Sequence, residues 1–265
     1  MLTSSNPAFR NLPSSGGYAG FNSAPAGFPG AQPGQRPAGA PPTVERPMTL
    51  DDVVTKTAMT LAVLMATGGV TYFIGPAAWG LALPAMIVGL VLALIVIFKK
   101  VVSPPLILAY AAVEGVFLGG ISGLIGTRVG NPGIVINAIV GTAAVFGGML
   151  VVYKTGAIKV TPRLTKWVIG ALIGAVGLML ANLVAGFFTD GGLGLRDGGP
   201  LAIGFSLLMI GIAAFVFLID FDAADQAIRA GAPEKTAWYI AFGLTVTLVW
   251  LYLEILRLLS YLQGE

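Results

Sequence analysis

The sequence of 265 residues contains no cysteine and no histidine, and only 10% of its residues are charged. The missing cysteines exclude disulfide bonds, thiolate nucleophiles and cysteine-based metal sites. The missing histidines exclude Ser-His-Asp and Cys-His catalysis, histidine-ligated zinc and a histidine pH switch. Titration near neutral pH would therefore depend on carboxyl or lysine groups whose pKa values are shifted by burial.

Hydrophobic residues make up 56% of the chain, and its mean hydropathy is +0.87. A typical soluble domain carries about 25% charged residues, far more than this chain does. No soluble core could bury so much apolar sequence. The composition therefore predicts a polytopic membrane protein with the lipid bilayer as its surroundings.

Residues 1–46 differ from the rest because Gly, Pro, Ala and Ser dominate them without any helical or strand period. Such a segment cannot bury enough surface to offset its ordering entropy, so we predict a disordered cytoplasmic tail. It lacks the apolar core of a signal peptide. The tail is either a solvated extension or a docking site for a membrane protein partner.

Seven apolar segments follow Asp51 and Asp52, each near the length of about 20 residues that a membrane-spanning helix needs. Loop-forming residues such as Gly75-Pro76 and Asn131-Pro132 separate them. We predict an all-α bundle of seven transmembrane helices within residues 47–265. The predicted spans are 54–75, 77–98, 104–126, 133–153, 166–188, 200–221 and 236–262.

The lysines and arginines predict the orientation of this bundle. With the N-terminus inside, twelve of the fifteen basic residues lie on the inner side, and only Arg128, Arg196 and Arg257 lie outside. Basic residues collect in cytoplasmic loops. We therefore expect a cytoplasmic N-terminus and an external C-terminus.

Glycines at four-residue intervals mark one face of two spans: Gly115, Gly119 and Gly123 in the third, Gly170 and Gly174 in the fifth. Small residues at this spacing let helix backbones approach closely. We expect a compact bundle with close helix contacts at both places.

Acidic residues lie inside otherwise apolar spans, where a carboxylate is costly and usually faces the bundle interior or water. Glu114 is in the middle of the third span and has no neutralising neighbour in the sequence. It is protonated, paired with a base on another helix or in contact with water. A buried structural hydrogen bond and a role lining an ion path both remain open for it.

Two further acids, Asp220 and Asp222, lie about 200° apart around a helix, so only one of them can face the interior. Asp222 shares a face with Asp225, Gln226 and Arg229, which is also typical of a solvated helix end.

Glu254 lies deep in the last span, and Arg257 is placed to form a local salt bridge with it. Alternatively, acids from two adjacent helices meet in the interior and share a proton.

The residues Phe221-Asp222 in the sixth span and Leu251-Tyr252-Leu253-Glu254 in the seventh resemble two motifs of the Bax inhibitor-1 (transmembrane Bax inhibitor motif) family. The resemblance covers residues from about 50 to 265. The glycine-rich tail and the sequence from Ala112 to Gly115 are similar to a bacterial branch of that family.

This resemblance implies a pH-sensitive calcium leak channel in the bacterial inner membrane, with Ca²⁺ as permeant ion and no cofactor. Two acids on the last two helices would share a proton and close the path. They fall on Asp222, or Asp220 in a shifted register, and on Glu254, where the family usually has Asp. Lys99 and Lys100 are the candidates for a basic latch, with Glu114 and Arg257 as further pore or latch candidates.

Three other functions compete with the channel. A membrane interaction protein would restrain other membrane machinery, such as a quality-control protease, through the flexible tail. A carboxylate-coupled transporter would often show duplicated halves, and the sequence has no clear repeat. An intramembrane aspartyl protease needs a GxGD order that residues 192–197 lack, so we expect no enzyme. Nothing in the sequence indicates nucleic-acid binding.

Overall fold

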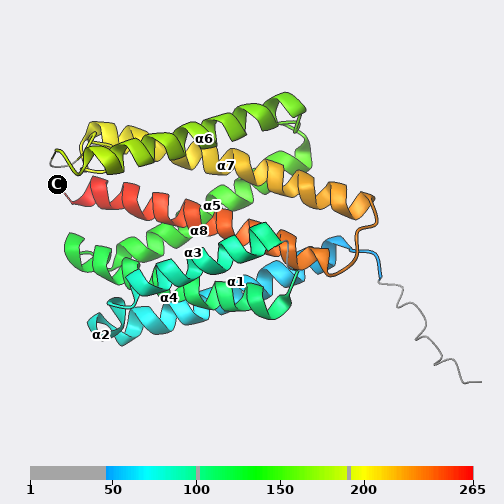
Figure 1. Cartoon of the computed structure of the whole chain (residues 1–265), viewed down its shortest axis with the longest axis horizontal. Helices are drawn as coiled ribbons and strands as arrows, with labels where there is room; N and C mark the ends of the chain where they lie inside the picture. Colours follow the sequence, from blue (N-terminus) through cyan, green and yellow to red (C-terminus); the bar gives the residue numbers. More distant parts are fainter. Residues whose placement is uncertain (1–45, 100–101, 190–191, 265) are drawn as a thin grey trace, which may run out of the picture. The chain divides into compact units, whose positions relative to one another are not determined.

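Figure 1 shows the computed structural model of the chain, which describes residues 46–99, 102–189 and 192–264. In these ranges the chain forms helices and no strand. The helices are α1 (Leu50–Ile74), α2 (Pro76–Trp79), α3 (Ala82–Lys99), α4 (Pro104–Val129), α5 (Gly133–Thr155), α6 (Pro162–Ala185), α7 (Pro200–Arg229) and α8 (Thr236–Gln263). All but α2 are long and apolar enough to cross a membrane. The prediction of an all-α membrane bundle with seven spans is confirmed.

Local chemistry sets the ends of these helices. Helix α1 begins with a capping box, in which the Asp52 amide donates to Thr49 Oγ1 (3.3 Å) and the Thr49 amide donates to Asp52 Oδ2 (2.9 Å). Proline occupies the first position of α2, α4, α6 and α7, where its missing N–H costs nothing. Helices α4 and α5 end at Gly130 and Gly156, whose φ angles of 71° and 67° suit glycine.

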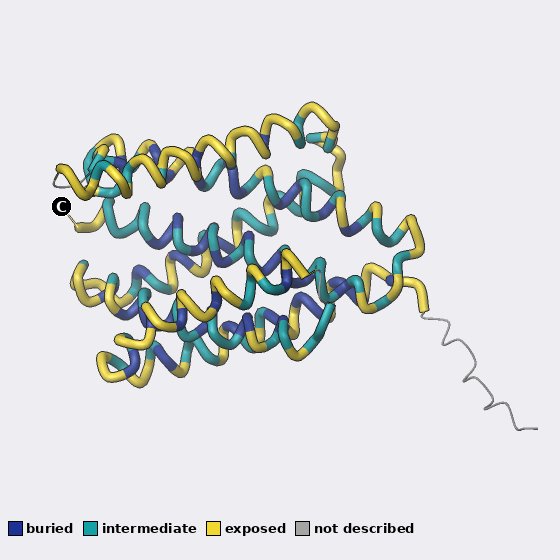
Figure 2. The backbone as a smooth tube through the Cα atoms, viewed as in Figure 1, coloured by how far each residue is buried: buried dark blue, intermediate teal, exposed yellow. Residues whose placement is uncertain are grey.

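Helices α4 and α8 form the centre of the bundle. Their most apolar stretches are 56% and 67% buried, against 11–17% for α1, α3, α5 and α6. A hydrogen bond of 2.7 Å between the hydroxyls of Ser122 and Tyr252 joins the two central helices. Helix α6 lies at the edge, packed against α7, and Figure 2 shows that most of its length is exposed. Exposed apolar side chains such as Trp167 suit a surface that faces lipid.

The close glycine contacts form at one of the two predicted places. A Cβ atom on Gly115 or Gly119 would collide with the backbone of α1 near Gly68, and one on Gly123 would collide with the indole of Trp79. The prediction for α6 is wrong, because the faces of Gly170 and Gly174 meet no other part of the described chain within 4 Å. Helix α6 packs against α7 through Ala175 and its neighbours instead.

The helix bounds differ from the predicted spans by up to four residues in most places, and by more in two of them. Helix α7 continues past residue 221 to Arg229. Side chains four residues apart hold this polar extension together: Gln226 donates to Asp222 (2.5 Å), and Arg229 pairs with Asp225 (2.7 Å). The predicted second span is divided, since the one-turn helix α2 precedes a turn at Gly80 and Leu81 before α3 begins.

Candidate functional site

Glu254 is the most deeply buried acid of the described chain, with a side chain that is 2% exposed. Two arginines bind it. Arg196, in the loop between α6 and α7, donates from Nη1 to Oε2 (3.2 Å) and from Nη2 to Oε1 (3.1 Å). Arg257, one turn further along α8, donates to Oε1 (3.0 Å). The local salt bridge to Arg257 therefore exists, and Arg196 adds a second and bidentate partner from another element.

The loop between α6 and α7 is built to hold Arg196 in this place. The side-chain carbonyl of Asn182 accepts hydrogen bonds from the amides of Leu193 (2.9 Å) and Leu195 (3.4 Å), which folds the loop back toward α6. The guanidinium carbon of Arg196 lies 5.4 Å from the centre of the Phe205 ring, close enough for a cation–π contact. These contacts help to position Arg196 between α7 and α8 independently of its hydrogen bonds to Glu254.

Sequence reasoning missed Arg196 as a site residue and counted it only as an external charge. A usable signal was present. A carboxylate buried in the second half of the last span needs a cation, and that end of the predicted bundle holds only three arginines. The glycine-rich loop gave no periodic pattern from which its path could be predicted.

Of the two neighbouring acids on α7, Asp220 faces α8. Its Oδ2 atom accepts a hydrogen bond of 2.8 Å from Thr247 Oγ1 on α8. Asp222 points to the polar side of α7, where it accepts a hydrogen bond from Gln226. The register of α7 therefore presents Asp220, rather than the acid of the Phe221-Asp222 motif, to the last helix.

The structure does not bring the acids of the last two helices together. Thr247, at the level of Asp220, precedes Glu254 by seven residues on α8, which corresponds to about 10 Å along the helix axis. Asp222 lies half a turn further from Glu254 than Asp220 does. Within the described ranges these acids share no hydrogen bond and each has its own partner. Their roles in gating remain predictions.

Glu114 is buried where α4 meets α3. Its Oε1 atom lies so close to Gly89 that a Cβ atom there would approach it to 2.7 Å. Its Oε2 atom is buried and has no hydrogen-bond partner among the described protein atoms. A lone buried acceptor of this kind is expensive. It is therefore the third carboxyl of interest in the bundle.

The latch candidates lie at different places. Lys99 ends α3 and is exposed, and Lys100 lies outside the described residues. A buried base that the sequence reasoning did not single out is Lys56 on α1, 8% exposed, whose ammonium group donates to Glu234 Oε1 (3.0 Å) and to the Glu234 carbonyl (3.0 Å). Its signal in the sequence was a lysine two residues inside the first predicted span, 54–75.

Lys56 belongs to a set of contacts that we call the N-terminal clamp, formed by Arg46, Asp52, Lys56 and Glu234. Arg46 pairs with Asp52 (2.8 Å) and Glu234 (3.3 Å), and the hydrogen bond to Asp52 raises the pKa of this arginine. The backbone joins in, because Met48 donates to the Ala232 carbonyl (2.8 Å). The chain just before α1 is thereby bound to the loop between α7 and α8.

Among the residues that the structure describes, no group of three or more acidic side chains is placed to hold a metal ion. The carboxyls of Glu114, Asp220 and Glu254 are instead spread through the bundle, each with different surroundings. Such an arrangement can attract cations or respond to protonation at separate places.

Comparison with known proteins gives the family. The sequence profile of the family described as Bax inhibitor 1 like matches residues 6–264, which is nearly the whole chain. A search of curated proteins found no match. The chain, a multi-pass membrane protein by its seven apolar helices, belongs to the Bax inhibitor 1 like family.

Proposed function

We propose that this protein is a pH-sensitive cation leak channel of the bacterial inner membrane, with calcium among the ions that it passes. Its N-terminus would lie in the cytoplasm and its C-terminus outside. Family membership supports a membrane role of this kind. Carboxylate oxygens suit Ca²⁺, and acidic groups in a pore favour cations.

The observation that carries the proposal is the buried ion pair between Glu254 and Arg196. In our proposal it keeps the loop between α6 and α7 against α8 and closes the ion path at that end. Acidification would protonate Glu254 and remove the charge that holds Arg196 and Arg257. The loop would then be released, and flux would rise as the pH falls.

We propose that Asp220, through its hydrogen bond with Thr247, also helps to close the ion path. Asp222, the acid of the family motif, is the alternative to Asp220 in this role. In this form of the proposal each acid acts with its own partner. It therefore departs from the shared proton that the family resemblance implies.

The test is calcium flux into proteoliposomes that contain the purified protein, measured from pH 5 to pH 8. The variants are Glu254→Gln, Asp220→Asn and Asp222→Asn. Arg163→Gln, an exposed arginine at the other end of α6, is the control. We expect Glu254→Gln to leak at every pH, Asp220→Asn to change the pH profile more than Asp222→Asn, and the control to match the parent protein.

Two outcomes would contradict the proposal at different levels. A pH profile that Glu254→Gln leaves unchanged would remove the gating role of Glu254 while keeping the channel. Flux that stays at the level of empty liposomes at every pH would remove the channel itself.

A second candidate function, a membrane interaction protein acting through its tail, is favoured by the N-terminal clamp. The clamp joins Arg46, at the end of the tail, and Met48, just after it, to the loop between α7 and α8. A partner such as a membrane protease that holds the tail would therefore act on the last two helices. Deleting residues 1–45 separates the two functions, because a channel should still conduct without the tail.

A further inference from the structure

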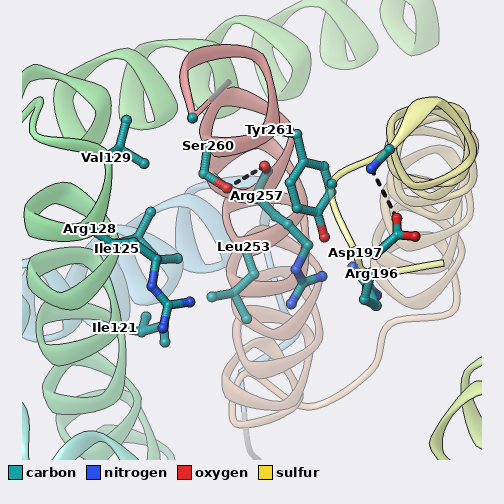
Figure 3. A pocket seen from close by; sticks show the side chains of 13 residues that line it. Ile121, Ile125, Arg128, Val129, Arg196, Asp197, Leu253, Arg257, Ser260 and Tyr261 are labelled. Carbon is teal, nitrogen blue, oxygen red and sulfur yellow. Dashed lines mark hydrogen bonds between the residues drawn. The ribbon is translucent and has the colours of Figure 1, made fainter. Parts of the chain in front are cut away.

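A cavity of about 730 Å³ lies at the end of the bundle where α4 and α8 terminate, above the Glu254 ion pair. This volume is within the range of small-molecule sites, which is roughly 300–1,000 Å³. Figure 3 shows its lining, with Arg128 from α4, Arg257 from α8 and Arg196 from the loop between α6 and α7. Three cationic side chains from three separate elements thus converge on one space.

Among the described residues at this cavity, three arginines outnumber the two acids Asp197 and Glu254. Glu254 binds both Arg196 and Arg257, and the Asp197 carboxylate accepts a hydrogen bond from the Gly199 amide (2.9 Å). Arg128 has no ion-pair or hydrogen-bond partner for its side chain in the described part of the chain. The position of Arg128 in the last turn of α4 is favourable because the C-terminal end of the helix dipole is negative. The helix dipole does not explain why two more arginines line the same cavity.

The floor of the cavity is apolar. Ile121 and Ile125 of α4 and Leu253 of α8 line it one or two turns deeper in the bundle than Arg128 and Arg257. Figure 3 shows the side chains of Arg128 and Arg257 extending toward Leu253 from two sides. A ligand that fits this lining carries a negative group at the level of the arginines and tolerates apolar contact below it.

We infer that this cavity binds a phosphate group, held by Arg128 and the outward-facing side of Arg257. Arginine presents a planar fork of donors that matches phosphate oxygens, and such charge-assisted hydrogen bonds are strong. The phosphate belongs to a phospholipid headgroup or is free in solution. Phosphate binding in this cavity does not require that the protein conducts ions.

The experiment measures the thermal unfolding temperature of the whole protein in a neutral detergent with added probes. The probes are short-chain phosphatidylglycerol, short-chain phosphatidylcholine, inorganic phosphate, and sodium chloride at matched ionic strength. The variants are Arg128→Gln and Arg128→Lys, with Arg163→Gln as the control for an exposed arginine outside the cavity. Native mass spectrometry counts the bound probe in each.

We expect phosphatidylglycerol or inorganic phosphate to stabilise the parent and Arg163→Gln, with a roughly tenfold weaker apparent affinity in Arg128→Gln and partial recovery in Arg128→Lys. Stabilisation by phosphatidylglycerol alone assigns the phosphate to a lipid, and equal stabilisation by inorganic phosphate assigns it to a free anion. If neither probe acts beyond sodium chloride, or if Arg128→Gln responds like the parent, the inference is wrong.

Discussion

Removing Arg196 tests whether the loop between α6 and α7 is held by the buried carboxylate. In Arg196→Gln, Glu254 loses two of the three hydrogen bonds that it accepts from arginine. Its side chain is 2% exposed, so water cannot replace them without a structural change. Breaking a buried ion pair completely costs about 3–5 kcal/mol. Because Arg257 remains, we expect a loss of about 2–3 kcal/mol in the free energy of unfolding.

Arg257→Gln is the matched comparison, since it removes one hydrogen bond from a side chain that is 33% exposed. We expect a loss of about 1 kcal/mol or less for it. The assay is denaturant unfolding of the purified protein in detergent micelles, completed as a double-mutant cycle with Glu254→Gln. In the Glu254→Gln background, Arg196→Gln should cost little, because the charge to be balanced has gone.

The reasoning is refuted if Arg196→Gln and Glu254→Gln are additive, since additivity would mean that the two side chains do not interact. Equal costs for Arg196→Gln and Arg257→Gln would also contradict it, because the bidentate partner should then contribute no more than the local one.

Three further predictions test other parts of the structure. Gly119→Val should lower the free energy of unfolding by at least about 1–3 kcal/mol, because the added side chain forces α1 away from α4. Gly174→Val is the control and should change it little. Equal effects of the two substitutions in the same unfolding assay would contradict the described packing. Glu114→Gln should raise the melting temperature in alkaline buffer, because a neutral amide costs less to bury than a carboxylate whose Oε2 atom has no described partner; a lower melting temperature would indicate that the carboxyl has a stabilising partner. Since the chain has no native cysteine, Ala157→Cys and Gln263→Cys should react from opposite sides of the membrane with an impermeant thiol reagent; labelling from the same side would contradict the orientation.

The membrane class and helix number could be predicted from sequence because apolar length is a property of each segment alone. The end of α7 could not. Hydropathy falls at Asp222, yet the helix continues because Gln226 and Arg229 find partners one turn back. Hydropathy measures where a helix leaves the membrane, and side-chain pairing decides where it ends.

The candidate site was only partly predictable. Helix geometry required Asp220 and Asp222 to face different ways, but the choice between them depends on how α7 packs against Thr247. Glu254 and its neighbour Arg257 could be paired from their spacing. Arg196 could not be placed, because a loop that folds back through Asn182 has no repeating pattern in its sequence.

The N-terminal clamp has a consequence for the order in which the protein is made. Lys56 and its partner Glu234 are 178 residues apart in the chain. At a synthesis rate of roughly 5–20 residues per second, about 10–35 s pass between the two. During this time α1 already has its lysine, but the counter-charge does not yet exist. Helix α1 can pack on α4 during this time, but the bonds of Lys56 to Glu234 form only after α7 has been made. A mutation that delays α7 would therefore prolong the time that this lysine spends without Glu234.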